Sequence, residues 1–227
     1  MSQTEKKHDM SKGKRFAVVL AGCGVYDGAE IHEATMTLYA ITLQGGSYQI
    51  FAPNTSQHHV LNHLNGEEMN ETRNVLVEAA RIARGNIKPL TDYAPDDFDA
   101  LIFPGGFGVA KNLCSFAFDG ADCMVIPEVS HAILDTHKKG KPIGALCISP
   151  VLLAKLIKGA KLTIGNDKDT ASTIESLGAV HQLTGHGEVA VDKSNLLFTT
   201  PCYMLDATIV DIANDAIAVV KEMIRHM

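Results

Sequence analysis

Short apolar runs that end in a glycine turn or a helix start alternate with segments of helical periodicity, and this alternation restricts the fold most. Arg15 to Gly22 (RFAVVLAG), Asp99 to Gly106 (DALIFPGG) and Lys141 to Cys147 (KPIGALC) are continuous apolar runs typical of strands covered on both faces. Glu71 to Gly85 (ETRNVLVEAARIARG) repeats its apolar residues at helical spacing. We therefore predict an α/β fold, in which helices cover both faces of a mostly parallel sheet.

The remaining segments extend the same pattern to the end of the chain. Further strands are predicted at 48–53, 161–165, 189–192 and 196–201, and further helices at 29–46, 128–140, 148–160 and 206–227. Pro150 is compatible with a helix only in the first turn, where its missing N–H leaves no hydrogen bond unmade. We expect a single domain over 15–227, preceded by a flexible tail over 1–14.

Composition narrows the classes of partner. The formal net charge is −6 and the pI is about 5.9, so no basic surface is available for nucleic acid or an anionic membrane. A small neutral or polar substrate fits better. No apolar run has the length of a signal peptide core or a membrane span, from which we expect a cytoplasmic protein. The 5 cysteines are scattered without zinc-site or disulfide-scaffold spacing, so free thiols are expected.

Cys147 stands where the strand 141–147 gives way to a helix. In a parallel sheet, ligands bind beyond the carboxyl ends of the strands, where the glycine loops GCGVYDG and PGGFG should also lie. The positive end of the following helix should favour the thiolate and lower the pKa of Cys147. The N–H of Ile148 is then one candidate oxyanion donor, and bare backbone N–H groups at Gly105 and Gly106 could supply a second.

Several motifs together resemble a known family. LIFPGGFG, GALCISP and DGAEIHEAT are similar to motifs of the PfpI superfamily, which includes the parkinsonism-associated deglycase and the class I glutamine amidotransferase domains. VVLAGCGVYDGAEIHEA, NETRNVLVEAARIARG, LTIGNDKDTA and TTPCYML resemble the ElbB-type, isoprenoid-biosynthesis-associated members that carry a glyoxalase description. The resemblance runs from Arg15 to the C-terminus. It implies a three-layer, flavodoxin-like (class I glutamine amidotransferase-like) sandwich.

The resemblance also implies site residues. The superfamily nucleophile falls on Cys147, the acidic residue that hydrogen-bonds it falls on Glu33, with Glu30 as the nearest rival, and the oxyanion donors fall on Gly106 and Ile148. Possible wall residues of the site are Glu30, Cys23, Gly105 and Cys202. The chain departs from deglycases and amidotransferases after the elbow helix, where KGAKLTIGNDKDTAS contains no histidine. His181 and His186 come later, and either could complete a triad.

A chemistry that needs only a thiol and a carboxyl group fits these residues. We expect a glyoxalase without cofactor, metal or glutathione, in which Cys147 adds to a small aldehyde substrate and Glu33 acts as acid and base. The alternatives are a non-catalytic redox-sensing protein, in which Cys147 is oxidised, and an accessory factor in isoprenoid biosynthesis. An amidase or amidotransferase ranks third, because no histidine is placed. The family resemblance further implies a homodimer.

Overall fold

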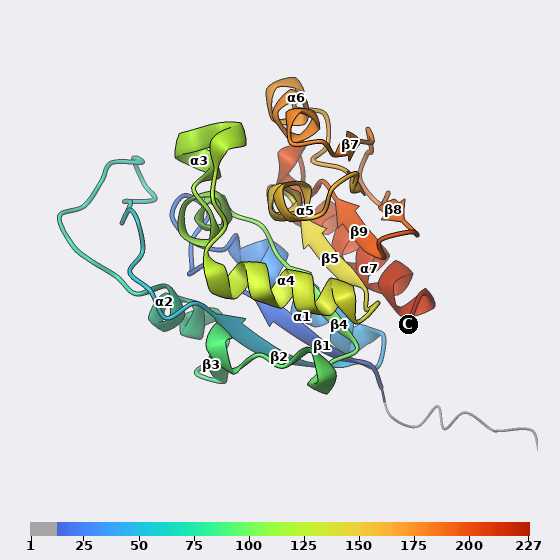
Figure 1. The fold of residues 1–227 in the computed structure, drawn as a ribbon. Coiled ribbons are helices and arrows are strands. Elements are labelled where there is room, and N and C mark those ends of the chain that lie inside the picture. The colour runs from blue at the N-terminus through green and yellow to red at the C-terminus, as the bar shows by residue number, and fades with distance from the viewer. Residues whose placement is uncertain (1–12) are drawn as a thin grey trace, which may run out of the picture.

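The central sheet has seven strands in the order β3-β2-β1-β4-β5-β9-β8 in the computed structural model, which describes residues 13–227 (Figure 1). Every neighbouring pair is parallel except β8 and β9, which are antiparallel. The strands are β1 (Arg15–Val19), β2 (Ser47–Ala52), β3 (Ile87–Pro89), β4 (Ala100–Phe103), β5 (Ile143–Leu146), β8 (Ala190–Asp192) and β9 (Leu197–Thr200).

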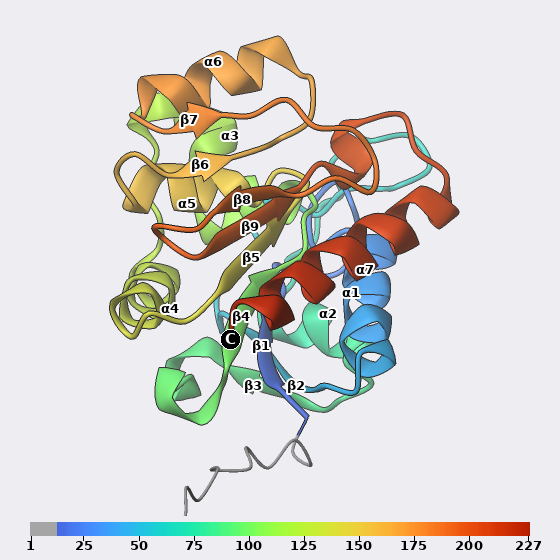
Figure 2. The same cartoon turned by 90° about the vertical axis from the view of Figure 1, so that its right-hand side faces the viewer.

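Helices cover both faces of this sheet (Figure 2). On one face, α1 (Ile31–Leu43), α2 (Val75–Ile82) and α7 (Ile209–Arg225) pack with Phe16, Ile102 and Phe198 of the strands. On the other face, α4 (Pro127–Lys138) and α5 (Pro150–Leu156) pack with Leu101, Phe103 and Ile143. The predicted three-layer α/β sandwich with a mostly parallel sheet is therefore confirmed.

Shorter elements gather beyond the carboxyl ends of the strands or link the main ones. They are α3 (Phe116–Asp119), α6 (Lys168–Ser176), a two-stranded sheet of β6 (Lys161–Leu162) and β7 (Val180–His181), the π-helix η3 (Val109–Leu113), and the 3-10 turns η1 (Leu90–Asp92), η2 (Pro95–Asp97), η4 (Gly120–Asp122) and η5 (Cys202–Met204). Neither α3 nor α6 was predicted, because both helices are short and polar residues dominate α6.

Capping residues explain where the predicted helices begin later than their periodicity suggested. Asn74 accepts a hydrogen bond from the N–H of Val77, so α2 starts at Val75 and the four residues from Glu71 onward lie outside it. Thr208 forms a capping box with Asp211 at the start of α7. At the other end of the chain, residues 1–12 of the predicted tail over 1–14 lie outside the described residues. Lys14 is already fixed, since its carbonyl accepts the N–H of Ser47 at 2.9 Å.

Candidate active site

Cys147 lies on a sharp turn between β5 and α5. Its backbone has a φ of 58°, in the left-handed region that an L-residue adopts only when its surroundings hold it there. The N–H of Cys147 donates to the carbonyl of Thr200 at 3.0 Å, and the hydroxyl of Ser149 donates to the carbonyl of Pro104 at 2.8 Å. Pro150 then opens α5 at its first position, as predicted. These contacts fix the elbow and turn the thiol toward the carboxyl edge of the sheet.

Two backbone N–H groups lie near the sulfur. The amides of Gly106 and Ile148 both act to lower the pKa of Cys147, so they favour its thiolate form. These are the two donors that the sequence proposed for an oxyanion. They come from different loops, after β4 and β5 respectively, so the parallel arrangement of these neighbouring strands brings them together.

Glu33 is the carboxyl group that touches the thiol. It lies in the first turn of α1 and is fully buried beside the Cys147 thiol, since a Cβ built on Gly105 would meet both side chains. Its Oε2 accepts the N–H of Gly105 at 2.9 Å, and its Oε1 accepts the N–H of Tyr203 at 3.2 Å. Both oxygens are thus held in place by the backbone, which orients the carboxyl group toward the sulfur.

Glu30, the rival of Glu33, has a different position. Its Oε2 accepts the N–H of Glu33 at 2.7 Å and caps the start of α1. Its side chain lines the cavity next to Cys147, as expected of a wall residue. The two carboxyl groups therefore divide the roles, with Glu33 against the sulfur and Glu30 at the cavity wall.

Burial governs the ionisation of the pair. Loss of solvent, followed by repulsion from the nearby carboxyl of Glu30, raises the pKa of Glu33 to about 8. The pKa of the Cys147 thiol is also raised, first by burial and then by the charge of Glu33. The predicted lowering of the Cys147 pKa is therefore wrong. The amides of Gly106 and Ile148 favour the thiolate, but burial outweighs them.

Gly105 could not carry a side chain. A Cβ at this position would collide with the Cβ of Cys147 and with the Glu33 carboxylate. Gly106 has a φ of 104°, and a Cβ there would collide with the backbone around Ala29. The two glycines therefore allow the loop after β4 to approach both the thiol and the carboxyl group closely.

A cavity of about 450 Å³ opens above Cys147, whose own side chain is at its base and only 7% exposed. Sequence reasoning missed most of its walls. They include Phe107 of the glycine loop, Phe116 of α3, Asp167 and Thr170 of α6, and Tyr203 of η5. Tyr203 lay within the quoted motif TTPCYML, directly after Cys202, and could have been considered.

The other cysteines do not enter this cavity. Cys23 was expected in its wall, but the Gly22–Gly24 turn places it near Glu78 and Arg81 of α2, so that expectation is wrong. Cys202 was also expected in the wall, but it is fully buried and does not line the cavity, so that expectation is wrong as well. Burial, and then the nearby charges, among them that of Glu33, raises the pKa of its thiol. All five cysteines of the chain lie in the described part and are free thiols.

The histidines do not complete a triad. Within residues 13–227, no histidine hydrogen-bonds to Cys147 or Glu33. His186 pairs instead with the buried Asp215 of α7 at 2.9 Å, and His181 lies in β7. His32 comes near the site, with its Nδ1 2.8 Å from the hydroxyl of Tyr203.

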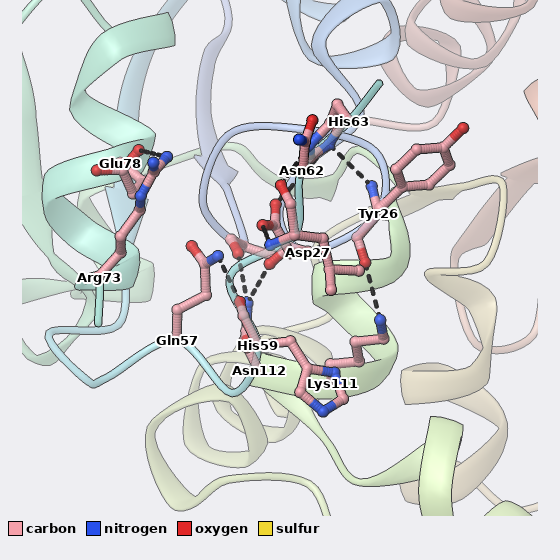
Figure 3. Close-up of polar contacts among 12 residues, drawn as sticks. Tyr26, Asp27, Gln57, His59, Asn62, His63, Arg73, Glu78, Lys111 and Asn112 are labelled. Atoms are coloured by element: carbon pink, nitrogen blue, oxygen red, sulfur yellow. Dashed lines mark hydrogen bonds and ion pairs between the residues drawn. The ribbon is translucent and has the colours of Figure 1, made fainter. Parts of the chain in front are cut away.

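His59 and His63 lie in the irregular segment between β2 and α2. Figure 3 shows how this segment is held: His63 accepts the N–H of Tyr26 at 3.2 Å, and Asp27 accepts the N–H of Leu61 at 2.7 Å.

The described residues contain no cluster of three His, Cys, Asp or Glu side chains arranged to hold a metal ion. None of their helices has the length and apolarity required to span a bilayer.

Comparison with known proteins gives the family. No family model matches the chain. It is 46% identical over 220 residues to the ES1 protein homolog, mitochondrial, of Rattus norvegicus, covering 92% of this chain and 83% of that protein. It is 44% identical over 220 residues to the glutamine amidotransferase-like class 1 domain-containing protein 3, mitochondrial, of Homo sapiens, covering 92% and 82%.

Comparison with solved structures gives the same family. An isoprenoid biosynthesis protein with an amidotransferase-like domain from Ehrlichia chaffeensis is 35% identical, with a TM-score of 0.88 and coverage of 94% of this chain and 99% of that one. Drosophila melanogaster DJ-1beta has a TM-score of 0.57 at 17% identity, covering 93% and 90%, which shows a shared fold alone.

The names of the rat and human relatives, and of the ES1 protein of Danio rerio, contradict the predicted cytoplasmic location, because they point to mitochondria. The prediction considered only apolar signal segments, and mitochondrial transit peptides are amphipathic rather than apolar. The family resemblance, in contrast, is confirmed along nearly the whole chain. The chain belongs to the ElbB-like family of glutamine amidotransferase-like class 1 proteins.

Proposed function

We propose that this protein converts glyoxal-type 2-oxoaldehydes to hydroxy acids without a cofactor, through a hemithioacetal on Cys147. The observation that carries this proposal is the contact between a thiol and a buried carboxyl group at the base of a cavity. The Cys147 sulfur lies beside Glu33, and the amides of Gly106 and Ile148 lie close enough to favour a negative charge on it. A nucleophile, a group that can move protons, and two oxyanion donors are thus available to one substrate carbon.

The oxidation of one substrate carbon is balanced by the reduction of its neighbour. Sγ of Cys147 bonds to the aldehyde carbon, the thiol proton passes to the Glu33 carboxylate, and the alkoxide that forms beside the two amides takes a proton back. Glu33 then removes the hydrogen of that carbon and returns it, through an enediol, to the neighbouring carbonyl carbon, while the hydroxyl proton on the first carbon passes to the oxygen of the second. The first carbon becomes a thioester and the second an alcohol, so no external oxidant or reductant is needed. Water cleaves the thioester, releasing the hydroxy acid and the thiol.

The raised pKa of Glu33 suits this sequence of transfers. A carboxyl group with a pKa near 8 exists in both protonation states around neutral pH, so it can accept and return protons with little energetic penalty. An ordinary carboxyl group would be a weak base for a thiol or a carbon-bound hydrogen. Burial of Glu33 therefore supports its assignment as the acid and base.

The alternatives are less well supported. Selective oxidation of Cys147 requires a resting thiolate, whereas burial raises the pKa of this thiol. An amidase would need a general base beside the thiol, whereas His186 pairs with Asp215 and His32 contacts the hydroxyl of Tyr203. A role in isoprenoid biosynthesis rests on the name of the Ehrlichia protein. A homodimer also stays a prediction, which sedimentation velocity can check.

The test is an assay of glyoxal and methylglyoxal conversion to glycolate and lactate, with no added metal or glutathione. The wild type is compared with Cys147→Ala and Glu33→Gln. Cys114→Ala serves as the matched control, because Cys114 is an equally buried free cysteine that lies outside the cavity above Cys147. We expect product from the wild type and the control, and none from the two site variants. Turnover that survives Glu33→Gln in a folded protein would refute the assigned mechanism.

A further inference from the structure

The cavity above Cys147 is larger than glyoxal requires. Glyoxal contains two carbons and two oxygens, which at the volume of about 30 Å³ that a water molecule takes up in the liquid amount to about 120 Å³. The cavity holds about 450 Å³ and lies in the range of pockets that bind far larger ligands. Most of the cavity is not occupied by substrate when glyoxal or methylglyoxal is bound to the sulfur.

The walls of this excess volume are mainly apolar. Phe116 and Ala117 of α3 form one part of the lining, and Val25, Phe107 and Met204 contribute from three other segments. α3 and α6 both lie beyond the carboxyl end of β5, on the side of the reactive turn (Figure 1). An apolar substituent on the carbonyl carbon would replace water against these side chains and gain binding free energy.

The charged groups of the lining carry a single sign. Glu30 and Asp167 contribute carboxyl groups, and none of the described residues that line the cavity is Lys, Arg or His. Hydrogen bonds from Thr170 lower the pKa of Asp167, so this group is a carboxylate. It also caps the start of α6, where the N–H of Thr170 donates to it at 2.8 Å. That helix end is therefore already neutralised and offers nothing to a substrate anion.

We propose that the preferred substrate is a neutral 2-oxoaldehyde whose substituent is apolar and about as large as an aromatic ring, and that aldehydes carrying a carboxylate or phosphate are excluded. This inference rests on the proposed function. It adds a substrate class that follows from the volume, the apolar walls and the carboxylates of the cavity.

The size of the substituent is tested with phenylglyoxal against methylglyoxal. We expect kcat/KM of the wild type to be at least about tenfold higher for phenylglyoxal. Phe116→Ala, which removes part of the wall, should lower kcat/KM for phenylglyoxal by about tenfold and for methylglyoxal by less than about twofold.

The matched control is Phe118→Ala in the same short helix. Phe118 lies outside the cavity lining and packs on His58, with ring centroids 4.2 Å apart, so this variant should keep the wild-type preference. Melting curves confirm that both variants are folded. Equal kcat/KM for the two substrates in the wild type, or equal losses in both variants, would overturn the inference.

The charge is tested with 4-carboxyphenylglyoxal against 4-methylphenylglyoxal, which have similar shapes. We expect the carboxylated substrate to react at least about a hundredfold less efficiently, and Asp167→Asn to recover about tenfold of that loss. Asparagine caps a helix as well as aspartate does, so this variant removes the charge and keeps α6. Equal efficiency for the two substrates would contradict the argument.

Failure of the proposed function is distinguishable from failure of this inference. If the wild type converts methylglyoxal but shows no preference for the ring, the inference alone fails. If the wild type converts none of these aldehydes, the proposed function fails, and binding decides the rest. Titration calorimetry with 2-hydroxyacetophenone and its 4-carboxy analogue then supports the inferred ligand class if only the neutral compound binds, and refutes it otherwise.

Discussion

Replacing Glu33 by glutamine should change the way in which stability depends on pH. Burial, followed by repulsion from Glu30, raises the pKa of this carboxyl from 4.5 to about 8. Between these values the folded protein keeps a proton that the unfolded chain has released. The stabilisation is complete below the unfolded pKa and is lost as the pH rises through the folded one, by up to about 1.4 kcal/mol per pH unit. Glutamine does not titrate, so Glu33→Gln lacks this slope.

The magnitude follows from the same two pKa values. Integrated from about pH 5 to about pH 8, the free energy of unfolding that Glu33 contributes falls by about 3.5 kcal/mol. Glutamine adds a constant offset. Its single carbonyl oxygen cannot accept both the N–H of Gly105 and that of Tyr203, and one unmet N–H costs about 1 to 3 kcal/mol at every pH. The slope is therefore diagnostic, whereas the absolute difference is not.

Urea unfolding of both proteins at constant ionic strength, from about pH 5 to about pH 8, measures this slope. We expect the variant to gain about 3.5 kcal/mol relative to the wild type across the range. His186, whose pKa is also raised through its hydrogen bonds to Asp215 and the carbonyl of Asp206, titrates equally in both proteins and cancels. A difference that stays constant to within about 1 kcal/mol would show that Glu33 is ionised throughout, and would refute the burial argument.

Three further predictions follow from the site. The kcat/KM for glyoxal should rise by up to about tenfold per pH unit and level off near pH 8, since Glu33 must be a carboxylate to take the thiol proton; a flat profile in product assays contradicts this. Gly105→Ala should lower the free energy of unfolding by about 1 to 3 kcal/mol and abolish turnover, whereas Gly185→Ala, where a Cβ meets no atom nearer than 3.8 Å, should do neither. His186→Ala should lower stability by about 2 kcal/mol in urea unfolding while turnover persists, and loss of turnover in a folded variant would place His186 in the mechanism.

The sheet and its covering helices could be predicted because their signals are local. β5 is a fully buried apolar run, and the position of Pro150 at the first turn of α5 follows from its missing N–H. Cys147 and Glu33 are 114 positions apart in the numbering, and nothing in the local sequence pairs them. That pairing came from the family resemblance, and the structure now supplies its geometry.

The features that the sequence did not predict depend on tertiary packing. The direction of the Cys23 side chain is set by the backbone of Gly22 and Gly24, which have φ angles of 115° and 125°. The sequence shows the two glycines but does not specify these backbone angles. The helix start beside Cys147, which lowers the pKa of this thiol, could be predicted from the sequence. The burial that raises the pKa by more depends on neighbours from other elements. Phe116 and Asp167 line the cavity because their short elements pack beyond the strands.

The carboxylates of the cavity also bear on the end of the proposed reaction. The proposed substrate is neutral, whereas the hydroxy acid that the proposed reaction releases from Cys147 is an anion in a cavity lined by Glu30 and Asp167. Repulsion by these groups acts on the product and leaves the neutral aldehyde unaffected, so it lowers the affinity for product alone. A basic residue in the lining would bind the carboxylate of the product and slow its release. The carboxylates that exclude anionic substrates in the proposal above thus also weaken the binding of the product. The Asp167 side chain, which caps α6, contributes to both effects.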